Sequence, residues 1–150
     1  MPQPVQVAGL WRGDFRVTGG SGEPCVGAAF QSAVGISFPY TLTVQQSGEG
    51  LTATSTSPAT GTTCQLAGTA GTSSIALKLT SCSSAAQPRF FSCVPDVFRE
   101  SLVSALTVNG TIAGSSLSGT YAETHNVFVS GTSTGVGTAT LTAQLALTKQ

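Results

Sequence analysis

Charged side chains are scarce in this chain, and their scarcity excludes one large class of partner. Only 8% of the 150 residues are Asp, Glu, Lys or Arg, against about 25% in a typical globular domain. The six basic residues balance the six acidic ones and lie scattered along the sequence. Binding to nucleic-acid phosphates needs basic side chains clustered on one surface. We therefore expect no nucleic-acid partner.

Long apolar runs and the motifs of common catalytic sites are also missing. No apolar run approaches the roughly 18 residues that cross a bilayer as a helix, so no membrane span is expected. The chain has no G-x-S-x-G, no H-E-x-x-H and no P-loop motif. Its single histidine limits a catalytic triad to Glu123, His125 and an unidentified serine. Catalysis is therefore the weakest function class and stays uncertain, and we expect neither a cofactor nor a metal.

The four cysteines show no C-x-x-C spacing, which argues against a zinc ribbon and a thioredoxin-type redox site. Two disulfides are the simpler interpretation. The segment from Cys82 to Asp96 carries two prolines and is expected to fold back as an irregular loop. That favours a Cys82–Cys93 bridge and leaves Cys25 with Cys64, although four cysteines allow three pairings. Because disulfides persist in oxidising compartments, we predict a protein that is secreted, periplasmic or at the cell surface.

Apolar residues that alternate with threonine are abundant, and clusters of glycine and serine interrupt them. Alternation of this kind is typical of half-buried strands, and the Gly/Ser clusters are typical of turns. The expected strands cover residues 9–18, 38–45, 51–57, 62–70, 73–81, 100–113, 117–124 and 136–148. Between the first two strands, apolar residues recur at helical spacing, so residues 25–37 are expected to form a short helix or an irregular lid. The pair Asn109-Gly110 is also a hairpin-turn signature, which would add a strand.

About eight short strands with tight connections predict one all-β domain over residues 1–150. An antiparallel up-and-down β-barrel is favoured over a sandwich because closure removes the exposed edges that so few charges could protect. Residues 1–8 are expected to form a flexible N-terminal arm, since their two prolines have nothing to pack against locally. At eight strands, the interior is either filled by side chains or just wide enough for one small ligand.

The segment Gly9-Leu10-Trp11 resembles the G-x-W motif that opens the first strand of lipocalins and their calycin relatives. The last strand, with Leu145, Leu147 and Lys149, is similar to the last strand of that family, which often brings a basic residue near the tryptophan. The resemblance implies that Trp11 packs at the closed end of the barrel. It also implies that a small apolar molecule binds inside, with residues 25–37 near the mouth as a lid.

The candidate ligand-binding residues are those that the strand pattern points into this interior. On the strand that begins at Leu117, Tyr121, Glu123 and His125 share the inward parity, so a carboxylate and the imidazole would reach the barrel mouth. Such a pair can orient a ligand, act as a general acid or base, or offer metal ligands. Aromatic residues on the inward faces either line a cavity or fill the core. The candidates are Trp11, Phe15, Phe38, Tyr40, Tyr121, Glu123 and His125.

Two functions are compatible with such a barrel. The first is a secreted lipocalin-like protein that binds a small apolar molecule inside the barrel. The alternative is a non-enzymatic structural or interaction protein, such as a subunit of an extracellular surface assembly, which self-associates through a neutral Ser/Thr-rich exterior. A connected apolar cavity would favour the carrier, and a filled barrel would favour the assembling protein.

Overall fold

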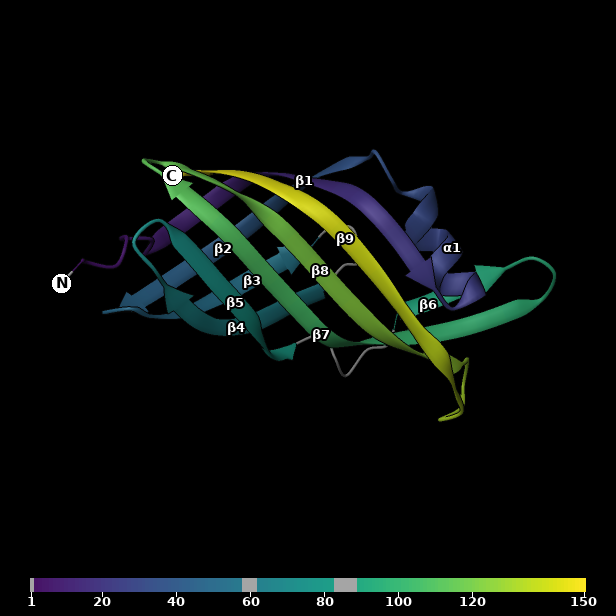
Figure 1. Ribbon diagram of the computed structural model, residues 1–150. Helices are drawn as coiled ribbons and strands as arrows, with labels where there is room; N and C mark the ends of the chain where they lie inside the picture. Colours follow the sequence, from purple (N-terminus) through teal and green to yellow (C-terminus); the bar gives the residue numbers. More distant parts are fainter. Residues whose placement is uncertain (1, 58–61, 83–88) are drawn as a thin grey trace.

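The computed structural model describes residues 2–57, 62–82 and 89–150, and these residues form a β-barrel with one short helix (Figure 1). In chain order, the elements are β1 (Gly9–Gly22), α1 (Pro24–Ser32), β2 (Ser37–Ser47), β3 (Gly50–Ser57), β4 (Thr62–Ala70), β5 (Ser74–Cys82), β6 (Arg89–Cys93), β7 (Val97–Ala113), β8 (Ser116–Val129) and β9 (Gly135–Lys149).

The strands follow the order β5-β4-β3-β2-β1-β9-β8-β7-β6, and β5 also pairs with β7. This additional pairing closes a ring of eight antiparallel strands and leaves β6 outside the ring, beside β7. The predicted all-β antiparallel barrel, with a helix between its first two strands, is confirmed.

The end of the barrel where both chain termini lie is covered by the N-terminal segment (Figure 1). Val7 is fully buried, and its backbone N–H donates to Gln46 Oε1 at 2.8 Å. The Val7 carbonyl accepts a hydrogen bond from Trp11 Nε1 at 2.8 Å, and the Val5 N–H donates to the Gly71 carbonyl. The sequence predicts a flexible arm over residues 1–8, whereas in the structure Val5 and Val7 are held by partners that local sequence does not show.

Helix α1 lies at the opposite end of the barrel, where it packs against β1, β9 and the start of β7 (Figure 1). Its buried residues are Cys25, Val26, Gly27 and Phe30. The helix ends at Ser32, earlier than the predicted end at residue 37. Gly35 has a φ of +90°, a conformation that favours glycine, and it turns the chain into β2.

One local expectation about the strands was wrong, and one alternative is excluded. Part of the predicted loop over residues 82–96 forms β6, which pairs from Arg89 opposite Ser101 to Cys93 opposite Val97; residues 83–88 lie outside the described residues. The predicted strand over residues 100–113 is part of β7, and the alternative of a hairpin turn is excluded because Asn109 and Gly110 lie inside this strand. Both are paired with β5 on one side and β8 on the other, and these two ladders keep the chain extended.

The expected disulfide pairing was also wrong, because the bonds are Cys25–Cys93 and Cys64–Cys82. Cys64 and Cys82 are direct register partners on β4 and β5. Strand β6, which the sequence did not predict, returns Cys93 to the first turn of α1, where Cys25 lies. The two disulfides indicate an oxidising environment, such as the extracellular space or a periplasm.

Side chains from all parts of the ring pack the barrel interior. Trp11, Phe15, Tyr40 and Tyr121 are each at most 1% exposed. The Phe15 ring centroid lies 5.5 Å from that of Tyr40 and 4.7 Å from that of Tyr121. These four aromatic residues therefore belong to the core, which is one of the two roles that the sequence left open.

Inward-facing glycines occur where neighbouring strands approach too closely for a side chain. At Gly119 on β8, an added Cβ would lie 2.2 Å from the Asn109 carbonyl oxygen of β7. We expect Gly119→Ala to lower the free energy of unfolding by about 1–3 kcal/mol, because the strands must separate to admit the methyl group. Denaturant titration of the purified variant measures this loss.

Gly135 on β9 provides the matched control, since an added Cβ there meets no atom within 4 Å. Gly135→Ala should change the free energy of unfolding by no more than about 0.5 kcal/mol. Equal stabilities of the two variants would contradict the role of Gly119 in strand approach.

Candidate functional site

Five of the seven predicted ligand-binding residues form one connected series of contacts in the barrel interior, and Trp11 and Phe38 are not part of it. Trp11 lies near the end that holds the chain termini, with Lys149 Nζ 6.0 Å from its ring centroid. Phe38 is partly buried and pairs with Phe15 across β1 and β2. Phe15 and Tyr40 belong to the aromatic core with Tyr121. The remaining candidates, Glu123 and His125, continue from Tyr121 along β8 toward α1 and form a polar group.

This polar group is a buried chain of hydrogen bonds. The Tyr121 hydroxyl donates to Glu123 Oε1 at 2.5 Å, and Glu123 Oε2 lies 2.6 Å from His125 Nε2. On the other side of the imidazole, His125 Nδ1 lies 3.0 Å from Ser101 Oγ. Glu123, His125 and Ser101 are at most 2% exposed. We call Tyr121, Glu123, His125 and Ser101 the buried polar chain.

The hydrogen bonds of the buried polar chain are compatible with a neutral imidazole in a single tautomer. With Glu123 ionised, its carboxylate only accepts, so the proton shared with His125 lies on Nε2. A neutral imidazole then has its lone pair on Nδ1, where it accepts the proton of the Ser101 hydroxyl. The result is a serine hydroxyl on one ring nitrogen and a carboxylate on the other, the set of groups found in catalytic triads.

Helix α1 covers the buried polar chain through one aromatic side chain. The Phe30 ring centroid lies 5.2 Å from that of His125 and 5.9 Å from that of Phe91 on β6, edge to face in both cases. Phe30 is 5% exposed. Phe30 therefore shields part of the His125 ring from solvent.

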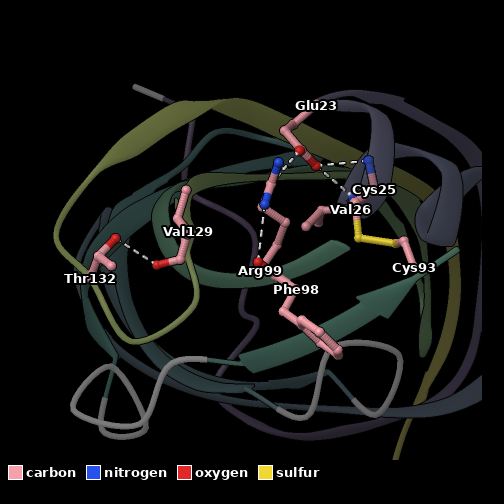
Figure 2. A network of polar contacts seen from close by, with 8 residues as sticks. All are labelled: Glu23, Cys25, Val26, Cys93, Phe98, Arg99, Val129 and Thr132. Atoms are coloured by element: carbon pink, nitrogen blue, oxygen red, sulfur yellow. Dashed lines mark hydrogen bonds and ion pairs between the residues drawn. A yellow bond between two sulfur atoms is a disulfide. The ribbon is translucent and has the colours of Figure 1, made fainter. Parts of the chain in front are cut away.

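Glu23 connects α1 to β7, as Figure 2 shows. Its Oε1 caps the helix by accepting the backbone N–H groups of Cys25 and Val26, both at 2.8 Å, and its Oε2 accepts from Arg99 Nε at 3.0 Å. The Glu23 side chain is 3% exposed and that of Arg99 is 23% exposed. The Cys25–Cys93 disulfide lies beside these contacts. The first turn of α1 is thus fixed to β6 and β7 at adjacent points.

An open groove of about 350 Å³ borders this joint, and we call it the mouth groove. Its walls are mostly apolar, and Val94 and Val136 are 95% and 38% exposed. The Arg99 guanidinium is the positively charged group among them. The lining residues are Glu23, Pro24, Cys25, Cys93, Val94, Val97, Arg99 and Val136.

Sequence reasoning missed Glu23, Arg99 and Ser101. A signal existed for Glu23, because an acidic residue before a proline and an apolar helical pattern is typical of a helix start. No signal separates Ser101 from the other serines. A bulge between Val103 and Ala105 reverses the parity of β7, so counting back by twos from the buried Leu106 would place Ser101 on the outer face.

Comparisons with known proteins add no relative. No family model, no curated protein and no solved structure matches this chain. In the part of the chain that the structure describes, no helix has the length and hydrophobicity to cross a membrane. Within the same residues, no three His, Cys, Asp or Glu side chains are grouped to hold a metal ion.

Tyr40 makes stability sensitive to alkaline pH. Its hydroxyl bonds Ser55 Oγ at 2.5 Å, and burial, with a smaller effect of the Glu123 charge, raises the pKa of Tyr40 well above its usual range. Above about pH 10 the unfolded chain loses this proton while the folded chain keeps it. The Tyr40 contribution to stability is therefore complete below that pH and is lost as the pH rises, by up to about 1.4 kcal/mol per pH unit.

Denaturant titrations between neutral pH and pH 11 test this, with the double variant Tyr40→Phe/Ser55→Ala as the comparison. The double variant replaces both hydroxyls, so that no buried partner is left unpaired. Its free energy of unfolding should fall less steeply above pH 10 than that of the unmodified protein. Identical slopes would show that Tyr40 does not cause the alkaline loss.

Proposed function

We propose that this protein is a secreted, lipocalin-like binding protein, whose ligand is a small, largely apolar, uncharged molecule with a hydrogen-bond acceptor such as a carbonyl group. The mouth groove is the observation that carries this proposal. Ligand sites of about 300–1,000 Å³ typically combine apolar walls with a few polar groups that fix orientation. The groove, at about 350 Å³, has exposed valines around one guanidinium.

The charges of the groove favour an uncharged ligand. Arg99 is paired with Glu23, so a carboxylate on the ligand would meet a neutralised cation and a nearby negative charge. A guanidinium has five N–H donors. In the described residues, Arg99 uses Nε toward Glu23 and Nη1 toward the Phe98 carbonyl. Its other N–H groups can donate to a carbonyl oxygen in the groove.

The mouth groove is also a better candidate for the ligand-binding site than the centre of the barrel. Aromatic side chains occupy the axis, whereas the groove is open to solvent at the end covered by α1. The lid position of α1 and the place of Lys149 beside Trp11 agree with the lipocalin-like resemblance. The two disulfides support secretion, because they form in oxidising compartments.

Binding of Nile red, an uncharged apolar dye with a carbonyl group, tests the groove. We expect saturable binding to the unmodified protein and about tenfold weaker binding to Val94→Ser/Val136→Ser. Two valines that lose their apolar contact with the dye weaken binding by about 1–2 kcal/mol. Fluorescence titration gives the dissociation constants.

Val34→Ser is the matched control for this titration. Val34 is 40% exposed, close to the 38% of Val136, but it does not line the groove. Its dye affinity should equal that of the unmodified protein. Failure of the unmodified protein to bind, or equal affinities of the groove and control variants, would refute the groove as the binding site.

A second candidate function is a structural or interaction protein, and the packed barrel interior favours it. The exterior also carries threonines paired across strands, such as Thr18 with Thr142 at 3.1 Å and Thr124 with Thr140 at 3.4 Å between hydroxyl oxygens. Such a neutral hydroxyl surface does not repel copies of itself. A subunit of an extracellular assembly would use it for contact.

Native mass spectrometry of protein purified from its producing organism separates the two functions. We expect a monomer with one discrete extra mass that is lost on collisional activation, because a bound small molecule dissociates before the chain unfolds. Ligand-free protein in regular higher-order species would instead support the assembly.

A further inference from the structure

We propose that Ser101 is a nucleophile that accepts acyl groups from small apolar esters, with His125 as its general base and Glu123 as the positioning residue. The inference adds a reaction to the proposed binding function and rests on it for the class of substrate. Its basis is the order of groups in the buried polar chain.

The distances meet the requirements for an activated serine. A nucleophile and its base lie within hydrogen-bond reach, about 2.6–3.2 Å, and a third group orients the base. Ser101 Oγ lies 3.0 Å from His125 Nδ1, and Glu123 Oε2 lies 2.6 Å from Nε2. In the serine-protease triad the serine contacts Nε2 and the carboxylate contacts Nδ1, whereas here the serine contacts Nδ1 and the carboxylate contacts Nε2. The chemistry is the same, because either nitrogen of a neutral imidazole accepts a proton once the other is held protonated.

Stability alone does not account for these groups. A buried ion-pairing carboxylate gives up hydration, and apolar side chains of similar volume usually stabilise a core as well or better. The barrel shows the simpler solution elsewhere: Ser55 is as buried as Ser101 but bonds a phenol, Tyr40, which is no base at neutral pH. Ser101, in contrast, contacts an imidazole that is itself bonded to a carboxylate.

The mouth groove and Ser101 are connected through β7. Arg99, which lines the groove, precedes Ser101 by two residues on β7, so both side chains share one face. At about 3.3 Å per residue, their Cα atoms lie about 6.6 Å apart along the strand. Arg99 and Ser101 are therefore successive residues on one face of β7. Phe30 covers the ring of His125 and must rotate away, while the disulfide at Cys25 holds the first turn of α1.

The reaction balances with ester and water alone. Ser101 Oγ bonds the ester carbonyl carbon as its proton passes to His125 Nδ1, and the leaving alcohol takes that proton when its C–O bond breaks. Water then adds to the acyl group on Ser101 and gives one proton to Nδ1. The acid leaves, and that proton returns to Ser101 Oγ.

Labelling with an alkyl fluorophosphonate tests the nucleophile directly on the folded protein. The serine oxygen bonds phosphorus, and fluoride and the serine proton leave. Intact-mass and peptide-mapping spectrometry should find one adduct, at Ser101. Ser101→Ala should abolish it, and Ser55→Ala, the equally buried control, should keep it. His125→Asn should slow labelling at least about 100-fold, and Phe30→Ala should accelerate it by uncovering the ring.

Nitrogen-15 NMR of the single histidine independently tests the proton positions that the proposal requires. At neutral pH, we expect Nε2 to carry a proton and Nδ1 to carry none, and Ser101→Ala to shift the Nδ1 resonance. Glu123→Gln should release the fixed tautomer and give a mixture. A doubly protonated ring in the unmodified protein would overturn the proposal, because Nδ1 could then accept nothing.

The outcomes separate this proposal from the proposed binding function. Nile red binding without a Ser101 adduct, in both the unmodified protein and Phe30→Ala, overturns the nucleophile and leaves binding intact. A Ser101 adduct without dye binding overturns the groove as a ligand site and leaves the nucleophile intact. An adduct at another residue counts against Ser101.

Discussion

The pairing of β5 with β7 is the contact on which the rest of the structure depends. It runs from Ser74 opposite Thr111 to Lys78 opposite Thr107 and closes the ring. Strand β7 has 17 residues, so its second half closes the barrel while its first half extends past β5 and pairs with β6. Arg99 and Ser101 lie on that first half. The length of one strand thus provides both a closed core and the wall of the mouth groove.

One carboxylate, that of Glu23, joins this wall to α1. It accepts two backbone N–H groups that a helix start leaves unpaired and one N–H of Arg99. A charged acceptor with three donors compensates the loss of hydration that burial imposes. The Cys25–Cys93 disulfide fixes the same turn covalently. Both restraints act at the beginning of α1, whereas Phe30, which covers His125, lies in its later part.

Strand alternation and the Gly/Ser turns were enough to predict the barrel, its helix and the inward parity of Glu123 and His125. Contacts between distant segments were not predictable. Strand β6 has five residues with two adjacent phenylalanines, so it lacks alternation, and without it the Cys25–Cys93 bond has no signal. The bulge near Ala105 reverses the parity of β7 and hides Ser101 from any count along the sequence. Both features depend on how distant strands pair, and the pattern of residues within one segment holds no information about that pairing.

The interior changes in character along the barrel axis. From the end at Trp11 to Tyr121, large apolar and aromatic side chains fill the ring, as an eight-stranded barrel requires when it holds no ligand. Beyond Tyr121, polar side chains enter the interior: Glu123 pairs with Leu141, and His125 pairs with Ala139. This part of the interior holds the His125 imidazole, the Glu123 carboxylate and the Phe30 ring. The apolar core and the buried polar groups therefore occupy different lengths of the same barrel, so substitutions at the α1 end leave the core that holds the ring closed unchanged.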